Sequence, residues 1–204
     1  PSIPYDDLAK IIRSKHIQGI NLFLDCSLPN LKQQKKIIKA LSKNDTLRFI
    51  DFKLPFTQQN LEALNTIFAN LGHIHGLRIE VVENIGMTNP KEALHLDYSQ
   101  MKNVLDLELI GYGDHPGIVT SLCSGFSGLV NIKRMRVHWG ARKDGMLILD
   151  EICRCLSQLS MLEELGLELK DEIEEENYYF IGFFPMIQKL ENLKVLVFET
   201  DLLL

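Results

Sequence analysis

A short pattern of apolar positions recurs along the whole chain. Its form is L-x-x-L-x-L, where L is a large apolar residue and x is any residue, as in Leu162-Glu-Glu-Leu165-Gly-Leu167. The first apolar residues of the seven units are Ile17, Leu47, Ile74, Val104, Ile132, Leu162 and Leu193. Successive units therefore begin 30, 27, 30, 28, 30 and 31 residues apart. Because this alternation is typical of a strand with one buried face, the pattern predicts seven short β-strands at a nearly constant spacing.

Between these strands, apolar residues recur at the spacing of three and four that predicts a helix with one buried face. The predicted helices occupy residues 27–43, a segment opening at Thr57, one opening at Asn89-Pro90, one opening at Pro116 and one after Asp144-Gly145. A sixth lies between residues 177 and 190 and contains Pro185, which must kink or restart it. A strand followed by a helix at this period is typical of leucine-rich repeats.

One strand and one helix cannot bury their own apolar faces, so neighbouring units must stack on a shared core. We therefore expect an α/β leucine-rich repeat solenoid of about seven strand–helix repeats, with a parallel sheet on its concave face. Units of 27–31 residues leave room for a full helix, which favours the ribonuclease-inhibitor-like horseshoe. Residues 1–204 are expected to form a single domain, and the start at Pro1 without a methionine indicates a fragment of a larger multidomain chain.

The chain departs from the usual repeat at the ninth position of each unit, where Asn or Cys is ordinarily found. The residues at that position are Asp25, Pro55, Val82, Tyr112, Gly140, Lys170 and Asp201. The sequence therefore lacks the usual asparagine ladder, and the turns after the strands must satisfy their backbone groups in another way.

Composition and charge narrow the class of protein. The chain is 46% hydrophobic and 24% charged, with a formal net charge of −5, whereas a generic nucleic-acid binder is basic. No apolar run approaches the ~20 residues that a membrane helix needs. The 4 cysteines show no C-x-x-C spacing, which indicates free thiols in a reducing compartment. We therefore expect a cytoplasmic protein with neither nucleic acid nor membrane as a partner.

Motifs with the spacing of a catalytic, cofactor or metal site are weak. The loop from Gly111 to Gly117 follows a strand, but its spacing is G-x-G-x-x-x-G instead of the dinucleotide-binding G-x-G-x-x-G. The segment from Ser124 to Gly128 misses the hydrolase motif G-x-S-x-G by one residue. We predict that the protein is not an enzyme and that this chain carries no catalytic, cofactor-binding or metal-binding residue. Nucleotide binding at the Gly111 loop is the enzymatic alternative.

Charged residues gather at the x positions of three neighbouring strands, whose side chains should point away from the core. The fifth unit is basic and lies between an acidic fourth and an acidic sixth unit. We favour charge pairing between the strands, and the alternative is a polar docking face for a protein partner. The candidate protein-binding residues on this concave face are Lys133, Arg134, Arg136, His138, Glu163, Glu164 and Glu168.

A second candidate surface is the loop after the sixth strand. It carries an acidic run at residues 171–176, followed at once by aromatic residues. Most of those aromatic residues fit helical spacing and should pack in the core. If exposed beside the acidic run, Tyr178 or Tyr179 would be a protein-binding hot spot, because tyrosine is enriched at such positions.

The long, irregular repeats without an asparagine ladder resemble the C-terminal leucine-rich region of cytosolic NOD-like receptors. The stretches 101–110 and 114–129 carry the closer similarity. The resemblance implies a larger chain in which an ATP-binding NACHT module precedes the repeats and contacts them. It also implies innate-immune sensing of bacterial flagellin or of secretion-system needle and rod proteins. The partner would be a CARD-bearing NOD-like receptor, and the outcome would be control of inflammasome and caspase activation.

Two other functions fit the same repeat pattern. A leucine-rich repeat chain also serves as a substrate adaptor in ubiquitin ligation or as an inhibitor of another enzyme. An F-box-like helical segment upstream of Pro1 would favour the adaptor, whereas an upstream NACHT module would favour the receptor.

Overall fold

The structure is a computed structural model of the 204-residue chain. It describes residues 5–14, 16–23, 31–82, 95–113, 116–141, 145–171 and 183–200. The predicted helix opening at Asn89-Pro90 and the two tyrosines Tyr178 and Tyr179 lie outside these ranges.

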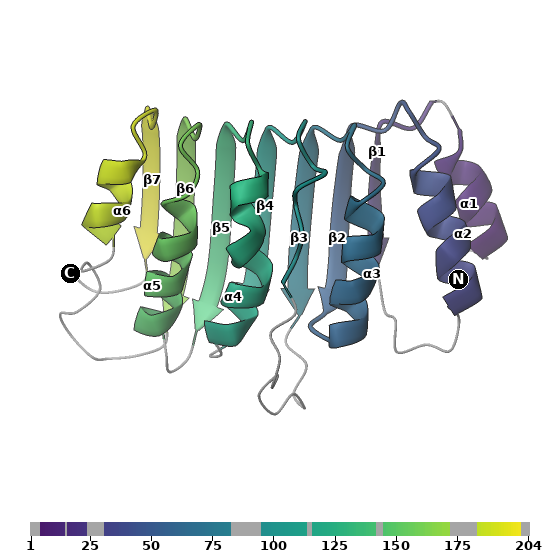
Figure 1. Cartoon of the computed structure of the whole chain (residues 1–204). Coiled ribbons are helices and arrows are strands. Elements are labelled where there is room, and N and C mark those ends of the chain that lie inside the picture. Colours follow the sequence, from purple (N-terminus) through teal and green to yellow (C-terminus); the bar gives the residue numbers. More distant parts are fainter. Residues whose placement is uncertain are drawn as a thin grey trace.

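The described residues form a single parallel β-sheet of seven strands, ordered along the sheet as they are along the chain (Figure 1). The strands are β1 (Gly19–Phe23), β2 (Phe49–Pro55), β3 (Gly76–Val82), β4 (Asp106–Tyr112), β5 (Arg134–Ala141), β6 (Glu164–Asp171) and β7 (Val195–Thr200). All six neighbouring pairs are parallel. Each strand begins two residues after the first apolar position of its unit, so the predicted strands and their pairing are confirmed.

The helices cover one face of this sheet, with α1 and α2 at the β1 end (Figure 1). They are α1 (Tyr5–Ile12), α2 (Leu31–Leu41), α3 (Gln58–Phe68), α4 (Pro116–Cys123), α5 (Gly145–Leu156) and α6 (Phe183–Lys189), with a 3₁₀ helix, η1 (Ser124–Gly128), directly after α4. The fold is therefore α/β, with strands and helices alternating along most of the described chain.

Local sequence signals explain several helix boundaries. The side chain of Thr57 caps α3 by accepting a hydrogen bond from the backbone N–H of Asn60. Pro116 is the first residue of α4, where no intrahelical N–H bond is lost. Pro185 lies in the first turn of α6, where the backbone N–H groups have no partner within the helix, and residues 177–182 of the predicted helix lie outside the described ranges. The N-terminal helix α1 has no counterpart among the predicted helices.

The core lies between the sheet and the helices. Along β4, Leu107 and Leu109 are buried against the helices, whereas Asp106 and Glu108 lie on the opposite face and are partly exposed. A line of aromatic rings runs through the core. Its ring centroids are 6.3 Å apart from Phe52 to Phe68, 5.3 Å from Phe68 to Tyr98 and 5.6 Å from Tyr98 to Phe126. The buried hydroxyl of Tyr98 donates to the carbonyl of Leu122 over 2.9 Å.

The turns before the strands hold neighbouring units together through side chains that sequence analysis did not single out. Asn103, Asn131 and Asn192 each directly precede the first apolar residue of a unit. Their amide groups donate to the carbonyl oxygens of Gly72, Lys102 and Ser160 over 2.6, 2.8 and 2.7 Å. A ladder of side chains therefore exists, but it lies at the entry of each strand and not at its ninth position.

The backbone carbonyl accepts a hydrogen bond at three of the ninth positions. The carbonyl of Val82 accepts from the N–H of Phe56 over 3.2 Å, and that of Gly140 accepts from the N–H of Gly113 over 2.8 Å. The carbonyl of Pro55 accepts from the side-chain amide of Asn60 over 2.6 Å. Continued strand pairing thus replaces the missing ninth-position asparagine at Val82 and Gly140, and a side chain of the following helix replaces it at Pro55.

Candidate functional site

The face of the sheet opposite the helices carries the predicted charged residues, and we call it the open face. It is formed by alternate residues of each strand, which the parallel register brings into rows across the sheet. One row contains Asp106, Arg134, Glu164 and Val195, the next contains Glu108, Arg136, Gly166 and Val197, and a third contains Ile110, His138, Glu168 and Glu199.

A chain of polar contacts crosses the open face, starting at β1. The side-chain amide of Asn21 donates to Asp51 Oδ2 over 2.7 Å, and Arg78 Nη1 donates to the same oxygen over 2.9 Å. Arg78 Nε then lies 3.5 Å from Glu108 Oε2 on β4. Asp51 is almost fully buried, and the amide and the guanidinium offset part of the cost of burying its carboxylate through Oδ2.

The same chain of contacts continues through His138 to β6. His138 lies between two carboxylates, with Nδ1 2.5 Å from Glu168 Oε2 and Nε2 3.3 Å from Glu108 Oε1. Lys170 Nζ lies 2.9 Å from the other oxygen of Glu168. Lys170, together with His138, holds the pKa of Glu168 below its ordinary value. The predicted residues His138 and Glu168 are therefore parts of one network that spans six strands.

Two of the three predicted basic residues on the fifth unit pair with carboxylates, as the favoured interpretation requires. Lys133 Nζ lies 2.6 Å from Glu163 Oε1, and Lys194 Nζ lies 2.7 Å from Glu163 Oε2. These two ammonium groups lower the pKa of Glu163 to about 2. Arg134 donates hydrogen bonds to Asp106 from both Nε and Nη2, and the bond from Nη2 is 2.8 Å long. The carboxylate of Asp106 raises the pKa of the Arg134 guanidinium.

Arg136 does not follow that pattern, and here the predicted charge pairing is wrong. It makes no ion pair with any residue that the structure describes. The residue opposite it on β4 is Glu108, which instead contacts Arg78 and His138, and the residue opposite it on β6 is Gly166. The exposed carboxylate of Glu164 is likewise without an ion pair among the described residues, although it lies near Arg134.

Several polar residues of the network were not among the predicted site residues, because that prediction rested on the charges of the fourth to sixth units alone. Asp51 and Lys53 on β2, and Arg78 and Glu80 on β3, occupy the same x positions as the predicted residues. Lys53 pairs with Glu80 across the two strands. Applying the alternation of strand side chains to all seven units would have found all four.

Large apolar side chains are also exposed on the open face. They occupy the same alternate positions as the charged residues and are Phe23, Phe49, Val82, Tyr112, Val195 and Val197. Exposed apolar residues beside a polar network are typical of protein-binding surfaces, where aromatic anchors are surrounded by polar groups.

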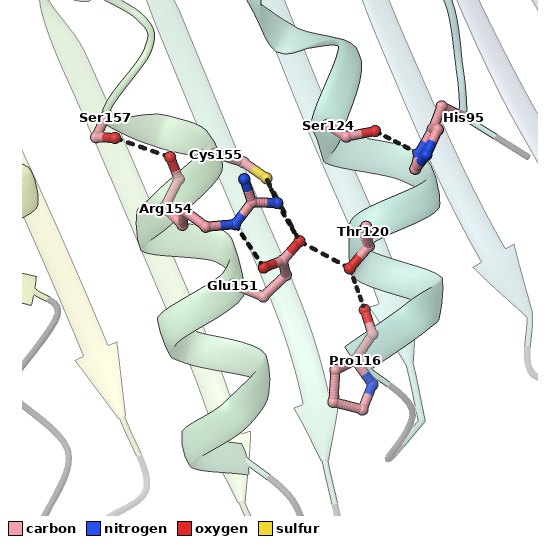
Figure 2. Close-up of polar contacts among 8 residues, drawn as sticks. All are labelled: His95, Pro116, Thr120, Ser124, Glu151, Arg154, Cys155 and Ser157. Carbon is pink, nitrogen blue, oxygen red and sulfur yellow. Dashed lines mark hydrogen bonds and ion pairs between the residues drawn. The ribbon is translucent and has the colours of Figure 1, made fainter. Parts of the chain in front are cut away.

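A second polar cluster lies among the helices on the other side of the sheet (Figure 2). Thr120 of α4 donates to Glu151 of α5 over 2.7 Å, and Arg154 donates to both oxygens of that carboxylate over 2.5 and 2.8 Å. Arg154, the main cause, lowers the pKa of Glu151. These contacts join α4 to α5, so the cluster stabilises the packing of two neighbouring helices.

The same view shows a serine and a histidine in contact. Ser124 Oγ lies 2.6 Å from His95 Nδ1 (Figure 2). In the part of the chain that the structure describes, no carboxylate contacts the ring of His95, and Ser124 begins a 3₁₀ helix instead of lying on a strand-to-helix turn. The arrangement therefore lacks the third group and the geometry of a hydrolase triad.

The glycines of the Gly111 loop have a packing role. A Cβ on Gly111 would lie 2.2 Å from the ring of Trp139, so only glycine leaves room for that indole. Trp139 Nε1 in turn donates to the carbonyl of Gly113 over 3.1 Å, and Gly113 has a positive φ of 134°. The contacts of Trp139 therefore explain why residues 111 and 113 are glycines, and a nucleotide-binding role is not needed to explain them.

The described cysteines are buried free thiols. Burial raises the pKa of Cys153 to about 12 and that of Cys155 to about 11, and the pKa of Cys123 is also well above its ordinary value. These thiols are therefore protonated at neutral pH and poorly nucleophilic. Within the described residues there is no group of three or more His, Cys, Asp or Glu side chains arranged to hold a metal ion. Nor does any described helix have the length and apolar character needed to cross a membrane.

Comparison with known proteins gives a likeness to solved structures alone. No family model matches the sequence, and no curated protein matches it. Among solved structures, the chain is similar to the tropomodulin C-terminal domain of Caenorhabditis elegans, with a TM-score of 0.44 and 10% identity over 93% of each chain.

Proposed function

We propose that this chain is a protein-binding leucine-rich repeat module whose open face is the binding surface. The strand–helix units recur at 27–31 residues, and their strands stack in chain order into one parallel sheet. A stack of this kind is expected to curve into a ribonuclease-inhibitor-like solenoid, with the open face on its concave side.

The observation that carries this proposal is the make-up of the open face. It combines exposed aromatic and aliphatic side chains with a polar network that spans six strands. The network holds its own side chains in fixed positions, so the face is preorganised and loses little side-chain entropy when a partner binds. Such a surface suits recognition of a folded or extended protein.

We further propose that the module belongs to a cytosolic innate-immune receptor of the NOD-like type. The support is the sequence resemblance, which in the stretches 101–110 and 114–129 is greatest to the NLR family apoptosis inhibitory protein. On this proposal the ligand is bacterial flagellin or a secretion-system needle or rod protein. The module would also contact a NACHT module in the resting receptor and control assembly with a CARD-bearing receptor.

Direct binding to purified proteins tests this function. The 204-residue chain is immobilised, and flagellin, needle protein and rod protein are each passed over it. We expect at least one to bind, and the double variant Phe23→Ser/Tyr112→Ser to bind it at least about tenfold more weakly, because two exposed hydrophobic anchors are lost. The matched control is Leu147→Ser, which removes an exposed apolar side chain from α5 on the helix side.

Two results would contradict the proposal in different ways. Failure of all three bacterial proteins to bind the wild-type chain would rule out the immune ligands and leave the adaptor or inhibitor functions. Equal binding by the wild-type chain and the open-face variant, with both folded, would show that the ligand binds elsewhere.

A further inference from the structure

The glycines on the open face differ in what covers them. A Cβ on Gly76 would lie 2.7 Å from the ring of Phe49, and one on Gly140 would lie 2.8 Å from the ring of Tyr112. In both places an aromatic ring from a neighbouring strand fills the space that the glycine leaves. Around Gly166, by contrast, the nearest side-chain atom to such a Cβ is Cγ of Arg136 at 3.4 Å, an ordinary contact distance.

Gly166 therefore lies at the floor of a groove in the open face. The groove has a volume of about 360 Å³ and lies over β5, β6 and β7. Arg136 stands on one side of Gly166 in its row, and the exposed side chain of Val197 stands on the other. Val195, in the neighbouring row of the same strand, also lines this apolar side of the groove. This volume is within the range of ligand-binding pockets, about 300–1,000 Å³, and admits more than one side chain.

The charges around the groove indicate what kind of side chain it accepts. Arg136 is an exposed guanidinium without an ion pair among the described residues, and it borders the uncovered glycine. Arginine binds a carboxylate through two parallel hydrogen bonds. Four carboxylates also line the groove and would together repel a ligand that carries several negative charges; they belong to Glu108, Glu164, Glu168 and Glu199. The charges therefore favour one carboxylate at the centre and disfavour nucleic acid and polyphosphate.

We propose that this groove, which we call the Gly166 groove, binds an extended protein segment that carries a single carboxylate flanked by large apolar residues. The carboxylate pairs with Arg136, and a flanking apolar side chain enters the space above Gly166 and packs on Val195 and Val197. This inference deepens the proposed function, since it names the partner chemistry of the same face.

Peptides of matched shape test the Gly166 groove. The ¹⁵N-labelled 204-residue chain is titrated with acetylated, amidated Leu-Glu-Leu, Leu-Gln-Leu and Leu-Lys-Leu and followed by two-dimensional NMR. We expect Leu-Glu-Leu to shift the amide signals of Gly166 and Val197 and the Nε–H signal of Arg136. The other two peptides should bind at least about tenfold more weakly, because they cannot form the charge-assisted pair.

Two variants assign the effect to the groove. Arg136→Gln should weaken binding of Leu-Glu-Leu by at least about tenfold, whereas Lys102→Gln, which makes the same charge change in an exposed turn, should not. Gly166→Val should fill the groove and abolish binding while the melting temperature stays equal or rises, because valine favours a strand. Gly19→Val, on β1 of the same face, is the control, since its Cβ would also meet only ordinary contacts. Should Gly166→Val fail to fold, Gly166→Ala takes its place.

The outcomes separate this inference from the proposed function. No shift at Gly166, or equal binding of the glutamate and lysine peptides, would overturn the Gly166 groove even if flagellin binds the chain. Loss of peptide binding in Arg136→Gln and Gly166→Val alone would support the groove even if all three bacterial proteins fail to bind.

Discussion

Whether a charged side chain at the open face is paired depends on the residues that the two neighbouring strands place opposite it. Glu163 has an ammonium group on each side, from Lys133 and Lys194, and both contacts are shorter than 3 Å. Arg136 has Glu108 on one side and a glycine on the other, and Glu108 contacts other residues. Charged residues in this region therefore differ in role, since Glu163 contributes to stability and Arg136 is free to bind.

The lowered pKa of Glu163 predicts a pH-dependent contribution to stability. The pKa is about 2 in the folded protein against an ordinary value of 4.5, so the folded state favours the ionised carboxylate. The stabilisation should be complete above about pH 5 and should be lost as the pH falls towards 2. We expect Glu163→Gln to lower the melting temperature by about 1–3 °C at pH 7 in low salt and to have no effect near pH 2.

Melting curves between pH 2 and pH 7 measure this difference. Glu164→Gln is the control, since Glu164 makes no ion pair among the described residues and its pH profile should follow that of the wild type. A Glu163→Gln difference that is constant across the pH range would contradict an electrostatic origin.

At the level of elements, the link between successive strand–helix units depends on the turns that precede the strands. Three asparagine side chains, in three different turns, donate to the backbone of the unit before. They replace the asparagine that leucine-rich repeats ordinarily carry after the strand. Hydrogen bonds thus link neighbouring units at both ends of the strands. Asparagine side chains form them before the strand, and continued strand pairing forms them after it.

We predict that this ladder contributes measurably to stability. Replacing Asn103, Asn131 and Asn192 together with alanine should lower the free energy of unfolding by about 1.5–3 kcal/mol, since each exposed hydrogen bond contributes about 0.5–1 kcal/mol and distant sites add. Urea denaturation measures the change. Asn70→Ala is the control, because its amide bonds only to Thr66 at the end of its own helix. A triple variant as stable as the wild type would show that water replaces these bonds without cost.

For the whole molecule, the sheet ends at β7 with an apolar surface. Leu196 is 41% exposed, whereas its register partner on β6, Leu165, is 1% exposed. Both occupy the second apolar position of their units, which faces the helices. The difference arises because each strand is covered in part by the unit that follows it, and no described unit follows β7.

This end of the sheet should make the 204-residue chain self-associate as its concentration rises. Leu196→Lys should weaken the association by roughly tenfold or more, because burial of leucine contributes about 1.5–3 kcal/mol. Sedimentation velocity over a concentration series measures the effect. Leu147→Lys, at an exposed leucine of α5, is the control. A wild-type chain that stays monomeric at high concentration would contradict the prediction.

The sequence by itself determined the strands, the faces of the sheet and where α3, α4 and α5 begin. These features depend on local rules, because strand side chains alternate and prolines and capping residues act on their own turn. The spacing of apolar residues therefore predicted where all seven strands begin and placed Arg134, Arg136, His138, Glu164 and Glu168 on the charged face of the sheet, with Lys133 and Glu163 directly before β5 and β6.

Only the tertiary structure decided which charges are paired and which are free. Asp106, Glu108 and Glu164 all looked like possible partners of the basic residues, but a carboxylate that already contacts two side chains has little to gain from a third. Glu108 reaches Arg78 and His138 on two different strands, and the register places Gly166 beside Arg136. Arg136 is unpaired among the described residues because side chains from other units already contact Glu108. These contacts join residues that are far apart in the sequence, so no local pattern could predict them.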